Sequence, residues 1–144
     1  MTLSRIGPYV IERELGSGGM GTVYLAQHVD GGTRAAVKIL PAALSREPGF
    51  VARFSREIDA LHAVKSPQIV ELLESGQDGE TYYYAMEYVE GETLTELLMR
   101  ERRLPWRDVV AMVLQMCAAL KAAHDAGIIH RDLKPSNLLV SADR

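Results

Sequence analysis

A glycine-rich segment near the start of the chain is the first feature that could do chemistry. Its sequence, Gly16-Ser17-Gly18-Gly19-Met20-Gly21, fits the spacing GxGxxG. In this pattern, backbone N–H groups unhindered by side chains can approach phosphate oxygens, although dinucleotide-binding folds and plain flexible turns share the pattern. A dinucleotide fold needs a helix after the last glycine and an acid about 20 residues later. Here strand-forming residues follow and residues 36–42 hold no acid, which favours a glycine hairpin between two strands.

A lysine in an apolar strand is the second candidate. Lys38 interrupts the run of residues 35–40, so its ammonium needs a counter-charge or a ligand unless it lies at an exposed sheet edge. Strand alternation puts Ala36 on the same face, where a small side chain suits a flat base. Glu57 lies on a predicted helix and is the best partner for Lys38, although such an acid is more often simply solvated.

The third candidate is the segment His130-Arg131-Asp132-Leu133-Lys134-Pro135-Ser136-Asn137, which follows a long predicted helix. It matches the catalytic-loop pattern HRDLxxxxN, and it follows the glycine segment and the lysine in the order found in protein kinases. From Tyr9 to Val140 the chain resembles the protein kinase family. The segments GSGGMGTVYLA and MEYVEGETL are similar to the corresponding segments of the eukaryotic-like serine/threonine kinases of bacteria.

The resemblance implies ATP and Mg²⁺ as ligands and proteins with Ser or Thr acceptors as substrates. Asp132 would accept the hydroxyl proton, Lys134 would neutralise phosphoryl charge and Asn137 would hold Mg²⁺. A lysine two residues after the aspartate is the serine/threonine variant. Met86 resembles the gatekeeper, Glu87 to Val89 the hinge, and Lys38 with Glu57 the phosphate-holding pair. The implied ATP-binding residues are Leu15, Gly16, Ser17, Gly18, Gly19, Met20, Gly21, Thr22, Val23, Ala36, Lys38, Glu57, Met86, Glu87, Val89 and Leu139.

Apolar patterning predicts the elements that must position these residues. A helix carrying Phe50, Phe54, Ile58 and Leu61 on one face is expected to end near Lys65, and residues 75–79 are expected to form a turn. We therefore expect an α+β fold: a kinase-like N-lobe over residues 1–90, with a five-stranded antiparallel sheet and one αC-type helix. Its strands are predicted at residues 9–16, 22–29, 35–40, 69–73 and 81–89.

The remaining residues, 91–144, predict the first helices and the catalytic loop of an incomplete helical C-lobe. Thr93 and Glu96 have capping-box spacing, and Gly127 suits the end of a helix over residues 106–126 whose broad apolar side requires burial. No DFG motif occurs within the 144 residues. We therefore expect this chain alone to be inactive and to expose an apolar patch. An ATP-binding pseudokinase and a non-catalytic interaction module remain alternatives.

Composition excludes several other classes. A formal net charge of −3 gives no basic field for nucleic acid or an anionic membrane. The single cysteine, Cys117, excludes an intramolecular disulfide, is expected to be buried, and together with scattered histidines offers no zinc-ligand spacing. Neither a signal peptide nor a membrane-spanning run is evident. The sequence predicts a cytoplasmic chain.

Overall fold

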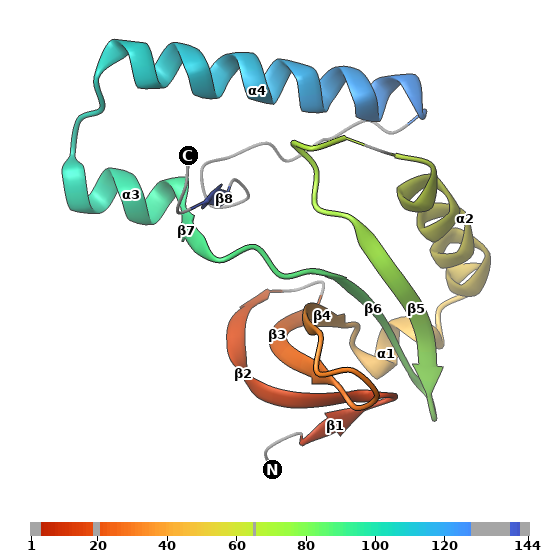
Figure 1. Cartoon of the computed structure of the whole chain (residues 1–144). Helices are drawn as coiled ribbons and strands as arrows, with labels where there is room; N and C mark the ends of the chain where they lie inside the picture. The colour runs from red at the N-terminus through yellow and green to blue at the C-terminus, as the bar shows by residue number, and fades with distance from the viewer. Residues whose placement is uncertain (1–3, 19–20, 65, 128–138, 142–144) are drawn as a thin grey trace. The chain divides into compact units, whose positions relative to one another are not determined.

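The computed structural model describes residues 4–18, 21–64, 66–127 and 139–141. These residues form two compact units (Figure 1). The first consists of Met1–His62 and Val70–Tyr88, and the second of Ala63–Ile69 and Val89–Arg144.

The first unit is built on an antiparallel sheet in the order β1-β2-β3-β4-β6-β5. The structure confirms the α+β class and contains the five expected strands, to which it adds a two-residue strand at the start of the chain. The bounds are β1 Arg5–Ile6, β2 Tyr9–Gly18, β3 Gly21–His28, β4 Arg34–Ile39, β5 Leu72–Asp78 and β6 Thr81–Glu87.

The two faces of this sheet have different characters because side chains alternate along each strand. One face carries the hydrophobic core, to which β4 contributes Ala35 and Val37 and β6 contributes Tyr83 and Ala85. These four residues are almost completely buried. The intervening residues of β4 and β6 therefore point to the opposite face, which carries the candidate site.

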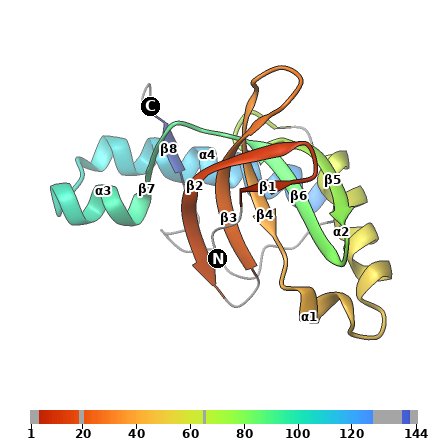
Figure 2. The same cartoon turned by 90° about the horizontal axis from the view of Figure 1, so that it is seen from below.

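The sheet curls until its two ends meet (Figure 2). The N–H of Gly7, in the turn between β1 and β2, donates a 2.8 Å hydrogen bond to Oδ2 of Asp78 at the end of β5. Glu74 of β5 forms a second link, because its Oε1 lies 3.7 Å from Nε2 of His28 on β3. Burial, assisted by the neighbouring Glu74 carboxylate, also raises the pKa of Tyr9 on β2. The curl thus gathers polar groups from both ends of the sheet.

The position of β5 corrects the sequence prediction. A strand was expected at residues 69–73 and a turn at residues 75–79, but β5 runs from Leu72 to Asp78 and the turn follows it. Gly76 is a strand residue, and a Cβ at that position would lie 2.6 Å from the Tyr83 hydroxyl oxygen. Its lack of a side chain serves this close approach rather than a turn.

Two helices belong to the first unit. The short α1, Ala42–Ser45, occupies part of the segment between Pro41 and Pro48. The longer α2, Phe50–Ala63, lies alongside β5 in both views (Figures 1 and 2) and ends two residues before Lys65, close to the predicted end. Its first turns pack on the sheet through Phe50 and Phe54, whose rings lie 5.3 and 5.2 Å from the ring of Tyr82.

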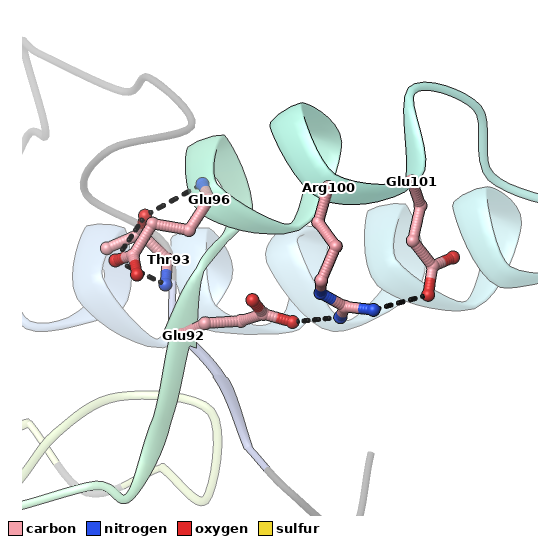
Figure 3. Close-up of polar contacts among 5 residues, drawn as sticks. All are labelled: Glu92, Thr93, Glu96, Arg100 and Glu101. Carbon is pink, nitrogen blue, oxygen red and sulfur yellow. Dashed lines mark hydrogen bonds and ion pairs between the residues drawn. The ribbon is translucent and has the colours of Figure 1, made fainter.

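The second unit begins with β7, Gly91–Thr93, which pairs with β8, Leu139–Ser141. Thr93 caps α3, Leu94–Glu101, as predicted: the Glu96 N–H donates to Oγ1 of Thr93 at 3.1 Å, and the Glu96 carboxylate accepts from the Thr93 N–H (Figure 3). Arg100 of the same helix bridges Glu92 and Glu101. The cap thus fixes the start of the helix, and Arg100 links its last turn to Glu92 of β7.

The long helix α4, Trp106–Asp125, was also predicted, together with Gly127 beyond its end, which adopts a φ of +83°. Among the described residues its apolar side is only partly covered, since Trp106 is 71% and Leu114 65% exposed. Cys117 is exposed as well, so the expectation that it is buried was wrong. Cys117 is exposed because it lies on the uncovered side of the helix, together with the neighbouring exposed positions. Within the described ranges, none of the helices has the length and apolarity to span a bilayer.

Candidate functional site

The candidate site begins with two rows of side chains that cross β3, β4 and β6. In one row Val23 lies opposite Lys38, which in turn lies opposite Tyr84. In the parallel row Ala36 lies opposite Met86. These side chains share the sheet face that points away from the core, and all five are half-buried. Four of them were predicted from the sequence; Tyr84 was not.

Lys38 lies near an aromatic ring. Its Nζ lies 6.0 Å from the centroid of the Tyr84 ring. Within the described part of the chain Lys38 forms no ion pair, and Glu57, its expected partner, is exposed on α2. The structure therefore does not join the two predicted partners in an ion pair, and the neighbour directly opposite Lys38 is Tyr84.

Tyr84 is close to both charges. Burial raises the pKa of its hydroxyl, and the negative charge of Glu57 raises the pKa further. The hydroxyl is therefore protonated throughout the neutral range, as an ordinary tyrosine would be. The ring offers its face to the Lys38 ammonium, and Glu57 lies near enough to act on the same side chain. Tyr84 thus faces Lys38 and is influenced by the charge of Glu57.

The glycine segment forms the end of the β2–β3 hairpin, as predicted. Gly16 pairs with Val23 and Gly18 with Gly21, while Gly19 and Met20 lie outside the described residues. Gly21 has a φ of +126°, and a Cβ there would lie 2.3 Å from the Ile39 carbonyl oxygen. A side chain is therefore excluded at Gly21 by the fold itself.

Gly16 is different, because a Cβ built on it meets no atom of the described residues within 4 Å. The fold does not demand a glycine at this position. A ligand that approaches the backbone closely would require a glycine there. Leu15, beside Gly16, is exposed at the same end of β2. Thr22 follows the hairpin on β3 and pairs with Ser17.

The predicted hinge begins with a residue that is tied down on both its main chain and its side chain. The N–H of Glu87 donates to the Glu71 carbonyl oxygen at 2.9 Å, and the Glu87 carboxylate accepts from the Glu71 N–H at 2.9 Å. Sequence reasoning did not find Glu71, for which no local pattern gives a signal. Because the Glu87 N–H is already engaged, only other hinge groups can serve a ligand.

The other predicted residues fall elsewhere. Asp132, Lys134 and Asn137 lie outside the described residues. Val89 and Leu139 belong to the second unit, where Leu139 pairs with Thr93. The described part of the candidate site is therefore the sheet face around Lys38 and the hairpin beside it.

Comparisons with known proteins agree on one family. The model described as "Protein kinase domain" matches residues 9–144. The serine/threonine-protein kinase pkn2 of Myxococcus xanthus is 42% identical over 135 residues, which are 94% of this chain and 16% of that protein. PknB of Mycobacterium leprae is 39% identical over 132 residues, 89% of this chain and 21% of that protein.

Solved structures give the same result. The PknI kinase domain of Mycobacterium tuberculosis matches with a TM-score of 0.84 and 32% identity, covering the whole of this chain and 59% of that one. A second crystal structure of that domain matches with a TM-score of 0.82 and 33% identity over 99% of this chain and 60% of that one. The chain thus spans about a quarter or less of these curated relatives and about three fifths of the solved kinase domain.

Proposed function

This chain belongs to the protein kinase domain family, and from that membership we propose that it is the nucleotide-binding and catalytic-loop part of a serine/threonine protein kinase. The protein would transfer the γ-phosphate of ATP to Ser or Thr hydroxyls of other proteins. Residues 1–90 would be the N-lobe, and residues 91–144 the start of the C-lobe.

The observation that carries the proposal is the environment of Lys38. Lys38 is half-buried on the sheet face that points away from the core and has no ion pair within the described residues. A partly desolvated cation is stabilised by an anionic partner, and a ring face supplies this stabilisation only in part. Ala36 leaves room beside it on the same face, as a flat base requires, and the β2–β3 hairpin turns next to it. An adenine nucleotide supplies both the base and the phosphates.

The remaining roles follow from the family motifs. Lys38 would bind the α- and β-phosphates, Asp132 would accept the proton of the acceptor hydroxyl, and Lys134 would neutralise charge on the transferred group. Asn137 would hold Mg²⁺, which supplies charge stabilisation on the phosphates when bound. An amide oxygen is a suitable hard ligand for that ion.

Two measurements on the purified 144-residue chain test this function. In the first, Mg·ATP is titrated into a sample whose fold has been verified by circular dichroism, and we expect saturable binding. In the second, labelled γ-phosphate transfer to a generic Ser/Thr substrate is compared between the wild type and Asp132→Asn. We expect no transfer by either, because the 144 residues contain no DFG motif to provide the second metal ligand.

The outcomes separate the alternatives. A folded chain that fails to bind Mg·ATP would contradict the proposed function and favour a non-catalytic interaction module. Transfer by the wild type that disappears in Asp132→Asn would establish a kinase and contradict the expected inactivity of this chain alone.

A further inference from the structure

Tyr84 and Lys38 are direct cross-strand neighbours, and the family motifs account only for the lysine. The register pairs Lys38 of β4 with Tyr84 of β6, and directly opposite side chains on one sheet face are the pairs that interact most strongly. The ammonium lies 6.0 Å from the ring centroid, at the outer limit of a cation–π contact. The backbone register makes the two residues neighbours, and their side-chain conformations bring the ammonium to the ring.

This contact matters because the described residues offer Lys38 no carboxylate instead. Glu57 is exposed and makes no ion pair with Lys38, so it does not fix the direction of the lysine side chain. A free lysine side chain has four rotatable bonds and loses much conformational entropy when it binds a ligand. A half-buried ring opposite it restricts that freedom before the ligand arrives.

We infer that Tyr84 is a positioning residue, whose ring holds the Lys38 ammonium on the ligand-binding face of the sheet while Glu57 is not paired with it. The inference rests on the proposed function, since it assigns Lys38 a phosphate to bind. Glu57 also influences Tyr84, as the raised pKa of the tyrosine shows. The same ring thus faces Lys38 and lies within the electrostatic influence of Glu57, and it keeps Lys38 in place without a direct ion pair.

The first arm of the test reads the contact itself and needs no nucleotide. The chain contains four lysines, so ¹³Cε-labelled lysine gives a simple NMR spectrum in which Lys38→Met identifies the Lys38 signal. We expect this signal to be shifted by the ring in the wild type and in Tyr84→Phe, and to move to an ordinary lysine position in Tyr84→Leu. Tyr24→Leu, which replaces a half-buried ring of β3 opposite Val37, should leave the Lys38 signal unchanged.

The second arm measures the dissociation constant of Mg·ATP. Tyr84→Leu should weaken binding about 3- to 5-fold, as loss of a marginal cation–π contact implies, and Tyr84→Phe should change it less than twofold. In a Lys38→Met background Tyr84→Leu should have no further effect, because the ring then has no ammonium to position. A merely structural role of Tyr84 would persist in that background.

Each outcome decides the inference. A Lys38 signal that does not move in Tyr84→Leu would overturn the contact, and unchanged or tighter Mg·ATP binding in that variant would overturn the positioning role. An equal loss of affinity in the Lys38→Met background would also overturn it. If the wild type shows the ring-shifted Lys38 signal but binds no Mg·ATP, the proposed function fails and the positioning role fails with it, although the contact stands.

Discussion

The backbone N–H of Gly7 and the carboxylate of Asp78 are joined by a 2.8 Å hydrogen bond, although these residues lie at opposite ends of the six-stranded sheet. The bond connects the β1–β2 turn to the end of β5. Tyr83 passes its hydroxyl between the same two segments, since a Cβ at Gly7 would lie 2.3 Å from that oxygen and one at Gly76 2.6 Å from it. The sheet that carries Lys38 is therefore held in its curled form by contacts far from the site.

Removal of this link should reduce stability without changing the site. We expect Asp78→Ala to lower the free energy of unfolding by about 1 kcal/mol, because the carboxylate is exposed and a charge-assisted bond is worth less there than in the interior. Asp78→Asn keeps an acceptor oxygen and should lose less than half as much. Urea unfolding followed by far-ultraviolet circular dichroism measures both, and equal stability of all three proteins would show that the bond does not fasten the sheet.

Parts of this arrangement were predictable and parts were not. Alternation along β4 was sufficient to place Ala36 and Lys38 on one face. It was not sufficient at Gly76, because local turn statistics favour glycine for its backbone freedom, whereas this glycine is fixed by Tyr83, which approaches it from the neighbouring strand. Such a distant contact leaves no signal in the residues around the glycine.

The glycines of the hairpin allow a matched pair of substitutions. Gly21→Ala should destabilise the chain by about 2–3 kcal/mol, because the Cβ would overlap the Ile39 carbonyl at a backbone φ of +126°. Gly16→Ala should change stability by less than about 0.5 kcal/mol, since nothing in the described residues crowds its Cβ.

The same pair tests the role of the hairpin in nucleotide binding. Gly16→Ala should weaken Mg·ATP binding even though its stability is normal, because the Cβ would intrude where phosphates approach the backbone. Thermal unfolding and nucleotide titration on the same samples separate the two effects. Normal nucleotide affinity in Gly16→Ala would contradict a close approach at this residue.

The capping box of α3 is a local and independent target. Thr93→Ala removes the oxygen that accepts the Glu96 N–H and should cost about 1 kcal/mol of stability. Thr95→Ala changes the same residue type within the helix and should be neutral or slightly stabilising, since alanine is the better helix former. Hydrogen exchange at the Glu96 N–H should accelerate in Thr93→Ala alone, and equal exchange in both variants would argue against the cap.

The alkaline stability of the first unit should depend on Tyr9. Burial, the hydrogen-bonded Glu74 carboxylate and Tyr83 raise the pKa of Tyr9 above its ordinary value of 10.0. As the pH rises through 10.0, Tyr9 therefore loses its proton in the unfolded chain before it does so in the folded chain. The contribution of Tyr9 to the free energy of unfolding is thus complete below that pH and is lost as the pH rises further. Tyr9→Phe should show a shallower fall in unfolding free energy between pH 9 and 11, about the range in which an ordinary tyrosine ionises. An unchanged slope in this variant would contradict the assignment.

The contacts of the predicted residues around Lys38 differ from those expected from the sequence. Opposite charges on neighbouring elements attract, and on this ground the sequence predicts a pair of Lys38 and Glu57. In the structure, Lys38 lies over Tyr84 instead. The sequence contained the information in part, since Tyr84 precedes Met86 by two residues and must share its face. What it lacked was the β4–β6 register, which alone places that tyrosine opposite the lysine.

Binding of Mg·ATP to the wild type, Lys38→Met and Lys121→Met tests the central claim most directly. Lys121 is an exposed lysine of α4 paired with Asp125, so its replacement removes the same charge from a residue that belongs to the second unit. We predict saturable binding by the wild type and by Lys121→Met, and at least a tenfold weaker affinity in Lys38→Met, a loss of about 1.4 kcal/mol or more. Equal affinity in all three folded proteins would contradict the assignment of Lys38 as the phosphate-binding residue.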